Sequence, residues 1–212
     1  LASFREDSSS RAMAEFLYGQ IQRLPLELKA AADAKALEIN PANLAVSGGG
    51  DASRLLVADV FRYWGSGGVQ LSVGFLENIS ATLRARILGC MNEWAEFCNV
   101  QFVESSPQDS LVRITFKGTR LSSALGIEIL FIDKTQPTMH LGGINDNTPE
   151  WVLRDHVCHE TGHTLGFPHE HLRPEIVSRI DPEKAIAFFM RTQGWSREEV
   201  IFNVLTPLSS SQ

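Results

Sequence analysis

The sequence lacks the features that would assign it to a membrane or to nucleic acid. It carries 19 lysines and arginines against 25 aspartates and glutamates, a net charge of −6, so it has no basic surplus for binding nucleic acid. No hydrophobic run approaches the roughly 20 residues that a helix needs to cross a membrane. These absences favour a globular protein with no nucleic-acid partner and no membrane span.

Cysteine is scarce as well, with three in 212 residues. Cys90 and Cys98 would lie about 12 Å apart along the helix expected there, beyond the reach of a disulfide. All three are therefore interpreted as thiols, and Cys158 as a small buried residue rather than a metal ligand. Residues 1–7 lack the charged and apolar regions of a secretory signal, so localisation stays open between secretion and the cell interior.

The most informative stretch covers residues 159–171 and contains the string HExxHxxGxxH. His159 and His163 are four residues apart, so on a helix both imidazoles project from one face toward a single ion. Gly166 ends the helix in a left-handed turn, and the reversal brings His169 to the same ion. Three nitrogens leave one tetrahedral position open, which is typical of a catalytic zinc site.

Glu160 follows the first histidine and would face the same ion, where it is the candidate general base. The alternative is a surface helix with merely polar histidines and an ordinary glycine cap. The joint spacing of five fixed residues favours zinc binding. His156, His140 and His171 have no place in the motif, and a role outside the ligand set is expected for each.

A glycine-rich joint at residues 47–50 divides the chain loosely near residue 50. Residues 1–50 are interpreted as an N-terminal helical or pro-like segment with a helix over 11–35. Asp181 and Ser196 are expected to cap two helices after the motif. The elements expected between the joint and the end of the motif helix are strands at 69–75, 100–103, 111–116, 127–132 and 138–141, and helices at 79–97 and 149–165.

The HExxHxxGxxH string resembles the signature of the metzincin zinc endopeptidases. Glu170 and Arg173, which follow the third histidine, are similar to residues of the astacin-like branch. This resemblance implies an α+β, zincin-like fold with a twisted mixed sheet of about five strands and two long helices, one carrying the zinc motif. It also implies that residues 51–212 form a zinc metalloprotease-like catalytic domain, with residues 127–132 as an edge strand that pairs with extended substrate.

Carried over residue by residue, the resemblance makes His159, His163 and His169 the ligands of one catalytic Zn²⁺ ion and Glu160 the catalytic base. Its implied function is a metalloendopeptidase that hydrolyses peptide bonds through a zinc-bound water, with a peptide or protein as substrate. Asp51 is a weak match to the aspartate that the family's pro-region presents to zinc, and a linker role is favoured for it. The sequence gives no sign of the oligomeric state.

One expected feature of that family is missing. Metzincins place a methionine in a turn beneath the zinc, in astacin-like members within Ser-x-Met-x-Tyr, and no such string follows His169. Met190 is the only later methionine, on a helical face where packing is favoured. The C-terminal subdomain is therefore expected to be incomplete. The alternative function is a catalytically impaired zinc-binding module that binds a peptide or a partner.

Overall fold

The computed structural model describes residues 19–41, 43 and 62–207, which fall into two compact units. The larger unit runs from Gly19 to Pro168, and the smaller unit begins at His169. Each unit buries a hydrophobic core of its own. The boundary expected near residue 50 and Asp51 lie outside the described residues.

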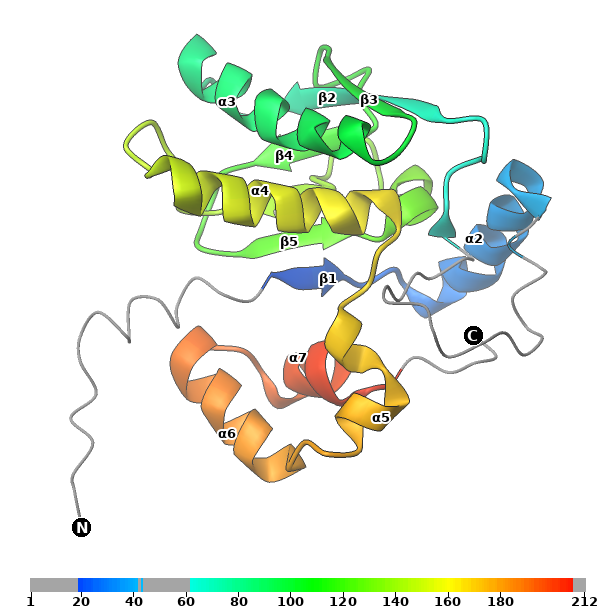
Figure 1. Cartoon of the computed structure of the whole chain (residues 1–212), viewed down its shortest axis with the longest axis vertical. Coiled ribbons are helices and arrows are strands. Elements are labelled where there is room, and N and C mark those ends of the chain that lie inside the picture. Colours follow the sequence, from blue (N-terminus) through cyan, green and yellow to red (C-terminus); the bar gives the residue numbers. More distant parts are fainter. Residues whose placement is uncertain (1–18, 42, 44–61, 208–212) are drawn as a thin grey trace. The chain divides into compact units, whose positions relative to one another are not determined.

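The larger unit is built on a six-stranded mixed sheet with the strand order β1-β5-β6-β4-β2-β3 (Figure 1). Strand β5 runs antiparallel to β6, β1 runs parallel to β5, and the other neighbours are parallel. The expected α+β class with a mixed sheet is confirmed. The strands are β1 (Gln20–Gln22), β2 (Val69–Phe75), β3 (Val100–Glu104), β4 (Val112–Thr115), β5 (Leu121–Ala124) and β6 (Met139–Leu141).

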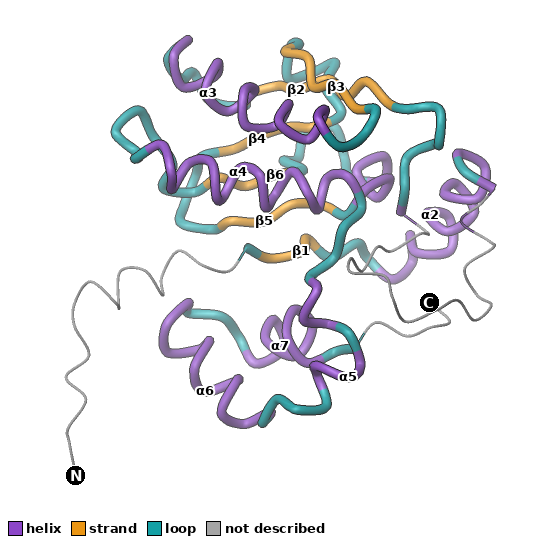
Figure 2. The backbone as a smooth tube through the Cα atoms, viewed as in Figure 1, coloured by secondary structure: helices purple, strands orange, loops and turns teal. Residues whose placement is uncertain are grey.

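Four helical segments of this unit are α2 (Leu26–Ile39), α3 (Ala81–Asn92), the 3-10 helix η3 (Glu93–Glu96) and α4 (Glu150–Leu165). Helices α3 and α4 lie side by side on one face of the sheet (Figures 1 and 2). Leu71 and Val73 of β2, Ile87 and Met91 of α3 and Leu153 of α4 are fully buried in the core. Burying each such side chain stabilises the fold by about 1.5–3 kcal/mol. The strand expected over 69–75 and the helix expected over 79–97 carry four of these five core side chains.

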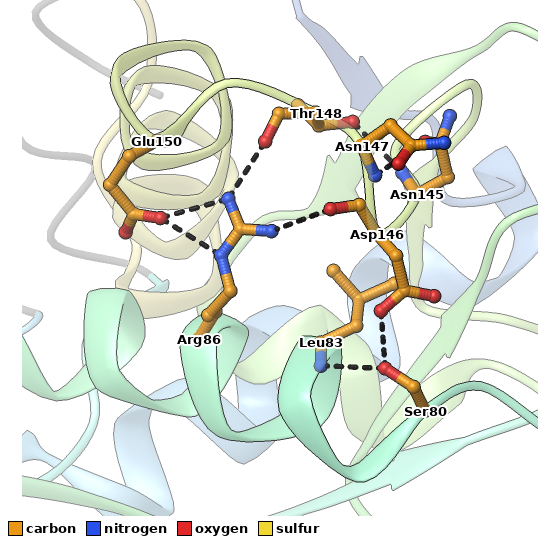
Figure 3. A network of polar contacts seen from close by, with 8 residues as sticks. All are labelled: Ser80, Leu83, Arg86, Asn145, Asp146, Asn147, Thr148 and Glu150. Carbon is orange, nitrogen blue, oxygen red and sulfur yellow. Dashed lines mark hydrogen bonds and ion pairs between the residues drawn. The ribbon is translucent and has the colours of Figure 1, made fainter.

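The turn that leads from β6 into α4 is held by Arg86 of α3 (Figure 3). Its guanidinium donates to the carbonyl oxygens of Asp146 at 3.3 Å and Thr148 at 2.8 Å, and it pairs with the Glu150 carboxylate at 2.8 Å. The Thr148 hydroxyl accepts from the amide of Asn145 at 2.9 Å and does not cap α4. An arginine on the neighbouring helix therefore fixes the turn at the start of α4.

The edge of the sheet differs from expectation. Residues 127–132 are not an edge strand: residues 127–131 belong to a 3-10 helix, η4 (Gly126–Phe131), and Ile132 is its C-cap. Glu128 in this helix pairs with Arg62 at 2.6 Å, and this distant partner cannot be read from the local pattern. Strand β5 was missed because its sequence, Leu-Ser-Ser-Ala, has low strand propensity. Strand β1 replaces part of the helix expected over 11–35, since three residues carry too little periodicity to be recognised.

The smaller unit is helical. Two predicted caps are confirmed: Asp181 accepts from the amide of the third residue after it at 3.2 Å, and Ser196 and Glu199 form a capping box. Met190 is 47% exposed whereas Phe189 beside it is buried, so the expected packing of Met190 is wrong. The elements are η5 (Glu170–Leu172), α5 (Pro174–Val177), α6 (Pro182–Gln193), α7 (Arg197–Val200) and the π-helical turn η6 (Ile201–Leu205).

Throughout the described residues, no helix combines the length and the apolar character that a membrane crossing requires.

Candidate metal centre

Helix α4 carries the first two histidines of the motif on one face. The ring centroids of His159 and His163 are 4.7 Å apart, and their Nε2 atoms are 3.1 Å apart. Two nitrogens bound to one tetrahedral zinc at about 2.0–2.1 Å would be separated by about 3.3 Å. The spacing of this pair therefore fits a shared ion. The expected helical placement of the two residues is confirmed.

The main chain after α4 fixes the ring of His163. Gly166 has a φ of 105°, and the amide of Phe167 returns to the carbonyl of Gly162 at 2.9 Å. This turn places the Phe167 carbonyl where Nδ1 of His163 donates to it at 2.7 Å, so Nε2 carries the lone pair. Burial, reinforced by neighbouring His159, lowers the pKa of His163 to about 3. The imidazole is therefore neutral at physiological pH, as a metal ligand must be.

Two residues from another segment support the same turn. The indole Nε1 of Trp64 donates to the carbonyl of Thr164 at 2.9 Å. A Cβ atom at Gly166 would lie 3.1 Å from the main-chain oxygen of Arg62, so the two backbones are closely packed. Sequence reasoning assigned neither Trp64 nor Arg62 to the site. No local signal could have done so, because 100 residues separate Trp64 from Thr164.

His169 is the third histidine of the motif and the first residue of the smaller unit, and it is 7% exposed. Nitrogen atoms of His159, His163 and His169 all lie within 4.8 Å of one another. The three residues are thus close together and could bind a metal ion. Three imidazole nitrogens are a donor set that suits zinc. Next to His169, Glu170 pairs with Arg173 at 3.3 Å.

Glu160 lies between the two histidines of α4 and is 1% exposed. Within the described part of the chain its Oε2 atom has no hydrogen-bond partner. Burial raises the pKa of this carboxyl well above its usual range, which suits proton uptake near neutral pH. The main chain at Gly19 lies against it: a Cβ atom there would overlap Oε1 of Glu160 and come within 2.8 Å of Cδ2 of His159. Sequence reasoning also missed Gly19, which has no motif around it.

The other candidate residues have separate surroundings. His156 is 5% exposed on α4, and Nδ1 of His140 lies 3.2 Å from the Ser122 hydroxyl. Nε2 of His171 lies 2.8 Å from a main-chain oxygen, that of Asn203. None of the three histidines belongs to the metal-competent cluster found among the described residues. The three cysteines, Cys158 included, are free thiols in this structure.

The chain matches the sequence model of a known protein family. The sequence model of the family described as Astacin (Peptidase family M12A) matches residues 57–185, more than half of the chain. The matched segment includes β2, α3 and the whole of α4, and it continues through His169 into the smaller unit.

Individual proteins match over part of their length. Human tolloid-like protein 1 and mouse tolloid-like protein 2 are each 27% identical over 114 residues, which is 54% of this chain and 10% of the relative. The chain therefore spans about a tenth of the length of these curated relatives. Among solved structures, that of myroilysin is similar with a TM-score of 0.62 and 28% identity, covering 70% of this chain and 72% of the other.

Proposed function

The chain belongs to the astacin family, peptidase family M12A, and on that premise we propose that it is a zinc-dependent endopeptidase acting on peptides or proteins. The observation that carries the proposal is the gathering of three histidine nitrogens within 4.8 Å of one another. His159, His163 and His169 would hold one zinc ion, and Glu160 would be the general base.

The proposed chemistry divides between the ion and the buried carboxyl. When bound there, zinc supplies a Lewis acid that polarises the scissile carbonyl and activates water. Glu160 takes the proton of the attacking water and returns it to the leaving amine. The Phe167 carbonyl keeps the ring of His163 oriented throughout.

We also propose that residues 1–50 act as a pro-like segment, and strand β1 supports this. Gln20–Gln22 pair in parallel with Ser122–Ala124 of β5, at the border of the sheet. Gly19, just before β1, lies against Glu160 and His159. An extended substrate that added to the sheet would need the free backbone groups of β5. In this structure β1 occupies the position beside β5. The sequence analysis had expected residues 127–132 to form the edge strand that pairs with substrate.

Hydrolysis of unfolded casein tests the proposal. Zinc-loaded protein should cleave casein, and a chelator should stop the cleavage. Glu160→Gln should lower turnover by at least about 100-fold, because an amide cannot accept the proton, while zinc content stays near one ion per chain. His163→Gln should instead lose the ion, since two imidazoles bind zinc far more weakly than three. Glu96→Gln, at an exposed acid of η3, is the matched control and should cleave at the parent rate.

Two results would contradict the proposal. Cleavage by Glu160→Gln at the parent rate would show that the base is wrongly assigned. The second result is a protein that binds one zinc ion yet leaves casein intact, both as the full chain and after proteolysis on the C-terminal side of the exposed Arg23. This result would favour the impaired binding module instead.

A further inference from the structure

The described part of the smaller unit contains a π-helical turn, η6, directly after α7. π-helical turns are rare, well under about 1% of residues, and often occur at functional sites. This turn is firmly held on its apolar side. Val200 is fully buried and Val204 is 5% exposed, in a core with Phe189 and Trp195.

Between the two valines, Asn203 turns its main chain toward two imidazoles. Its carbonyl oxygen accepts from Nδ1 of His169 at 3.3 Å and from Nε2 of His171 at 2.8 Å. The two rings are stacked, with centroids 5.1 Å apart and planes inclined by 21°. Asn203 is 2% exposed, and its side-chain amide donates to the carbonyl of Glu199 at 3.0 Å. The main-chain oxygen of Asn203 thus orients both rings. The side-chain hydrogen bond to Glu199 holds Asn203 against α7.

The two imidazoles use opposite nitrogens toward this oxygen. A carbonyl oxygen only accepts, so Nδ1 of His169 carries the proton and Nε2 carries the lone pair that a metal would need. In His171 the proton lies on Nε2 instead. The Asn203 carbonyl therefore holds His169 and His171 in different tautomers. In the sequence, only their spacing from Gly166 distinguishes the two histidines.

We propose that Asn203 is a positioning residue of the metal centre: its carbonyl, presented by the π-helical turn, selects the Nδ1–H tautomer of His169 and orients Nε2 toward the metal. The inference rests on the proposed function in so far as His169 is a metal ligand. It adds a residue from outside the motif, 34 positions beyond the histidine it acts on. The role corresponds to that of the Phe167 carbonyl for His163, with the difference that here the acceptor comes from a distant turn.

The test compares Asn203→Leu with Val204→Ala in the full chain. The leucine is close to asparagine in size but cannot donate to Glu199, so the turn loses the bond that fixes its carbonyl. Removing such an orienting partner weakens metal binding by about 10–100-fold. Val204→Ala removes packing from the same turn and leaves the side-chain bond of Asn203 in place. Zinc affinity is read by competition with a chelator, and the tautomer of His169 in metal-free protein by ¹⁵N NMR.

The expected result is a split between the two variants. Asn203→Leu should show a mixture of His169 tautomers and zinc affinity reduced about 10–100-fold. Val204→Ala should lower the melting temperature while its tautomer and zinc affinity match the parent. His171→Phe keeps a stacked ring without the second donor and should also bind zinc like the parent.

Three outcomes would overturn the inference: parent-like tautomer and affinity in Asn203→Leu, equal losses in both turn variants, or loss of zinc in His171→Phe. Zinc affinity and tautomer are measured without substrate. A protein that fails to cleave casein would therefore refute the proposed function while these measurements still decide the role of Asn203.

Discussion

At the scale of the residue, the Glu160 carboxyl fits beside Gly19 because glycine has no Cβ atom. A Cβ atom at that position would overlap Oε1 of Glu160, and the carboxyl cannot move aside because it is 1% exposed. We therefore expect Gly19→Ala to push the start of β1 away from α4. The pairing of Gln20–Gln22 with β5 should weaken, and hydrogen exchange at these amides should accelerate.

Gly67→Ala is the control for this substitution, because a Cβ atom there would meet nothing within 4 Å. It should leave exchange in β1 unchanged. Protection of β1 that is equal in Gly19→Ala and in the parent would show that the segment can shift without losing its pairing.

At the scale of the element, β4 and the loop before β6 are held together by one buried cation. Arg113 is 2% exposed and donates to five carbonyl oxygens. Three of the acceptors, Ile132, Asp133 and Gln136, belong to the loop that leads from η4 to β6. This network fixes a loop that has no regular structure of its own.

Replacing this guanidinium should therefore be costly. Arg113→Lys offers at most three donors for five acceptors, so at least two of the five hydrogen bonds are lost. We expect the free energy of unfolding to fall by about 2–4 kcal/mol, measured by urea denaturation. Arg154→Lys changes an exposed arginine that pairs with Glu93 and should cost under about 0.5 kcal/mol. Equal losses in the two variants would contradict the role of Arg113.

At the scale of the whole molecule, buried histidines control how stability responds to acid. Burial lowers the pKa of His140, His156 and His171, and it lowers the pKa of His163 to about 3. In the folded chain these groups bind protons at a lower pH than in the unfolded chain, where a histidine has a pKa of about 6.5. Each therefore contributes stability above pH 6.5 that is lost on acidification, by up to about 1.4 kcal/mol per pH unit.

Glu160 acts in the opposite direction. Burial raises its pKa, so its contribution is present below the unfolded value and is lost as pH rises. Between about pH 4.5 and 6.5 His163 and Glu160 act in opposite directions, and the lowered pKa values of the other three histidines act in the same direction as that of His163. We expect the free energy of unfolding of metal-free protein to fall as pH drops through this range.

Urea denaturation with a chelator present, at a series of pH values, measures this dependence. His156→Gln removes one of the three titrating histidines outside the ligand set, so the stability of this variant should fall less steeply with acid than that of the parent. A parent whose stability rises between pH 6.5 and 4.5 would contradict the account.

The sequence predicted the features that depend on residues close together in the chain, and it did not predict those that depend on residues far apart. Helix α4, its end at Gly166 and the pairing of His159 with His163 were all foreseen, since each depends on residues within a few positions of one another. Strand β2 and helix α3 were foreseen because their apolar periods are long. The 3-10 helix η4 and strand β5 were not foreseen. The Arg62–Glu128 pair of η4 joins residues far apart in the chain, and the small residues of β5 form no hydrophobic period.

The sequence by itself determined the chemistry of the candidate centre, because the spacing of histidines on a helix and the left-handed glycine are properties of a contiguous stretch. Only the tertiary structure decided what surrounds that stretch. It placed β1 at the edge of the sheet and the backbone of Gly19 next to Glu160. It also placed the carbonyl of Asn203 within hydrogen-bonding distance of His169. Each of these contacts joins residues at least 34 positions apart, and which of them meet is settled by packing that no local pattern records.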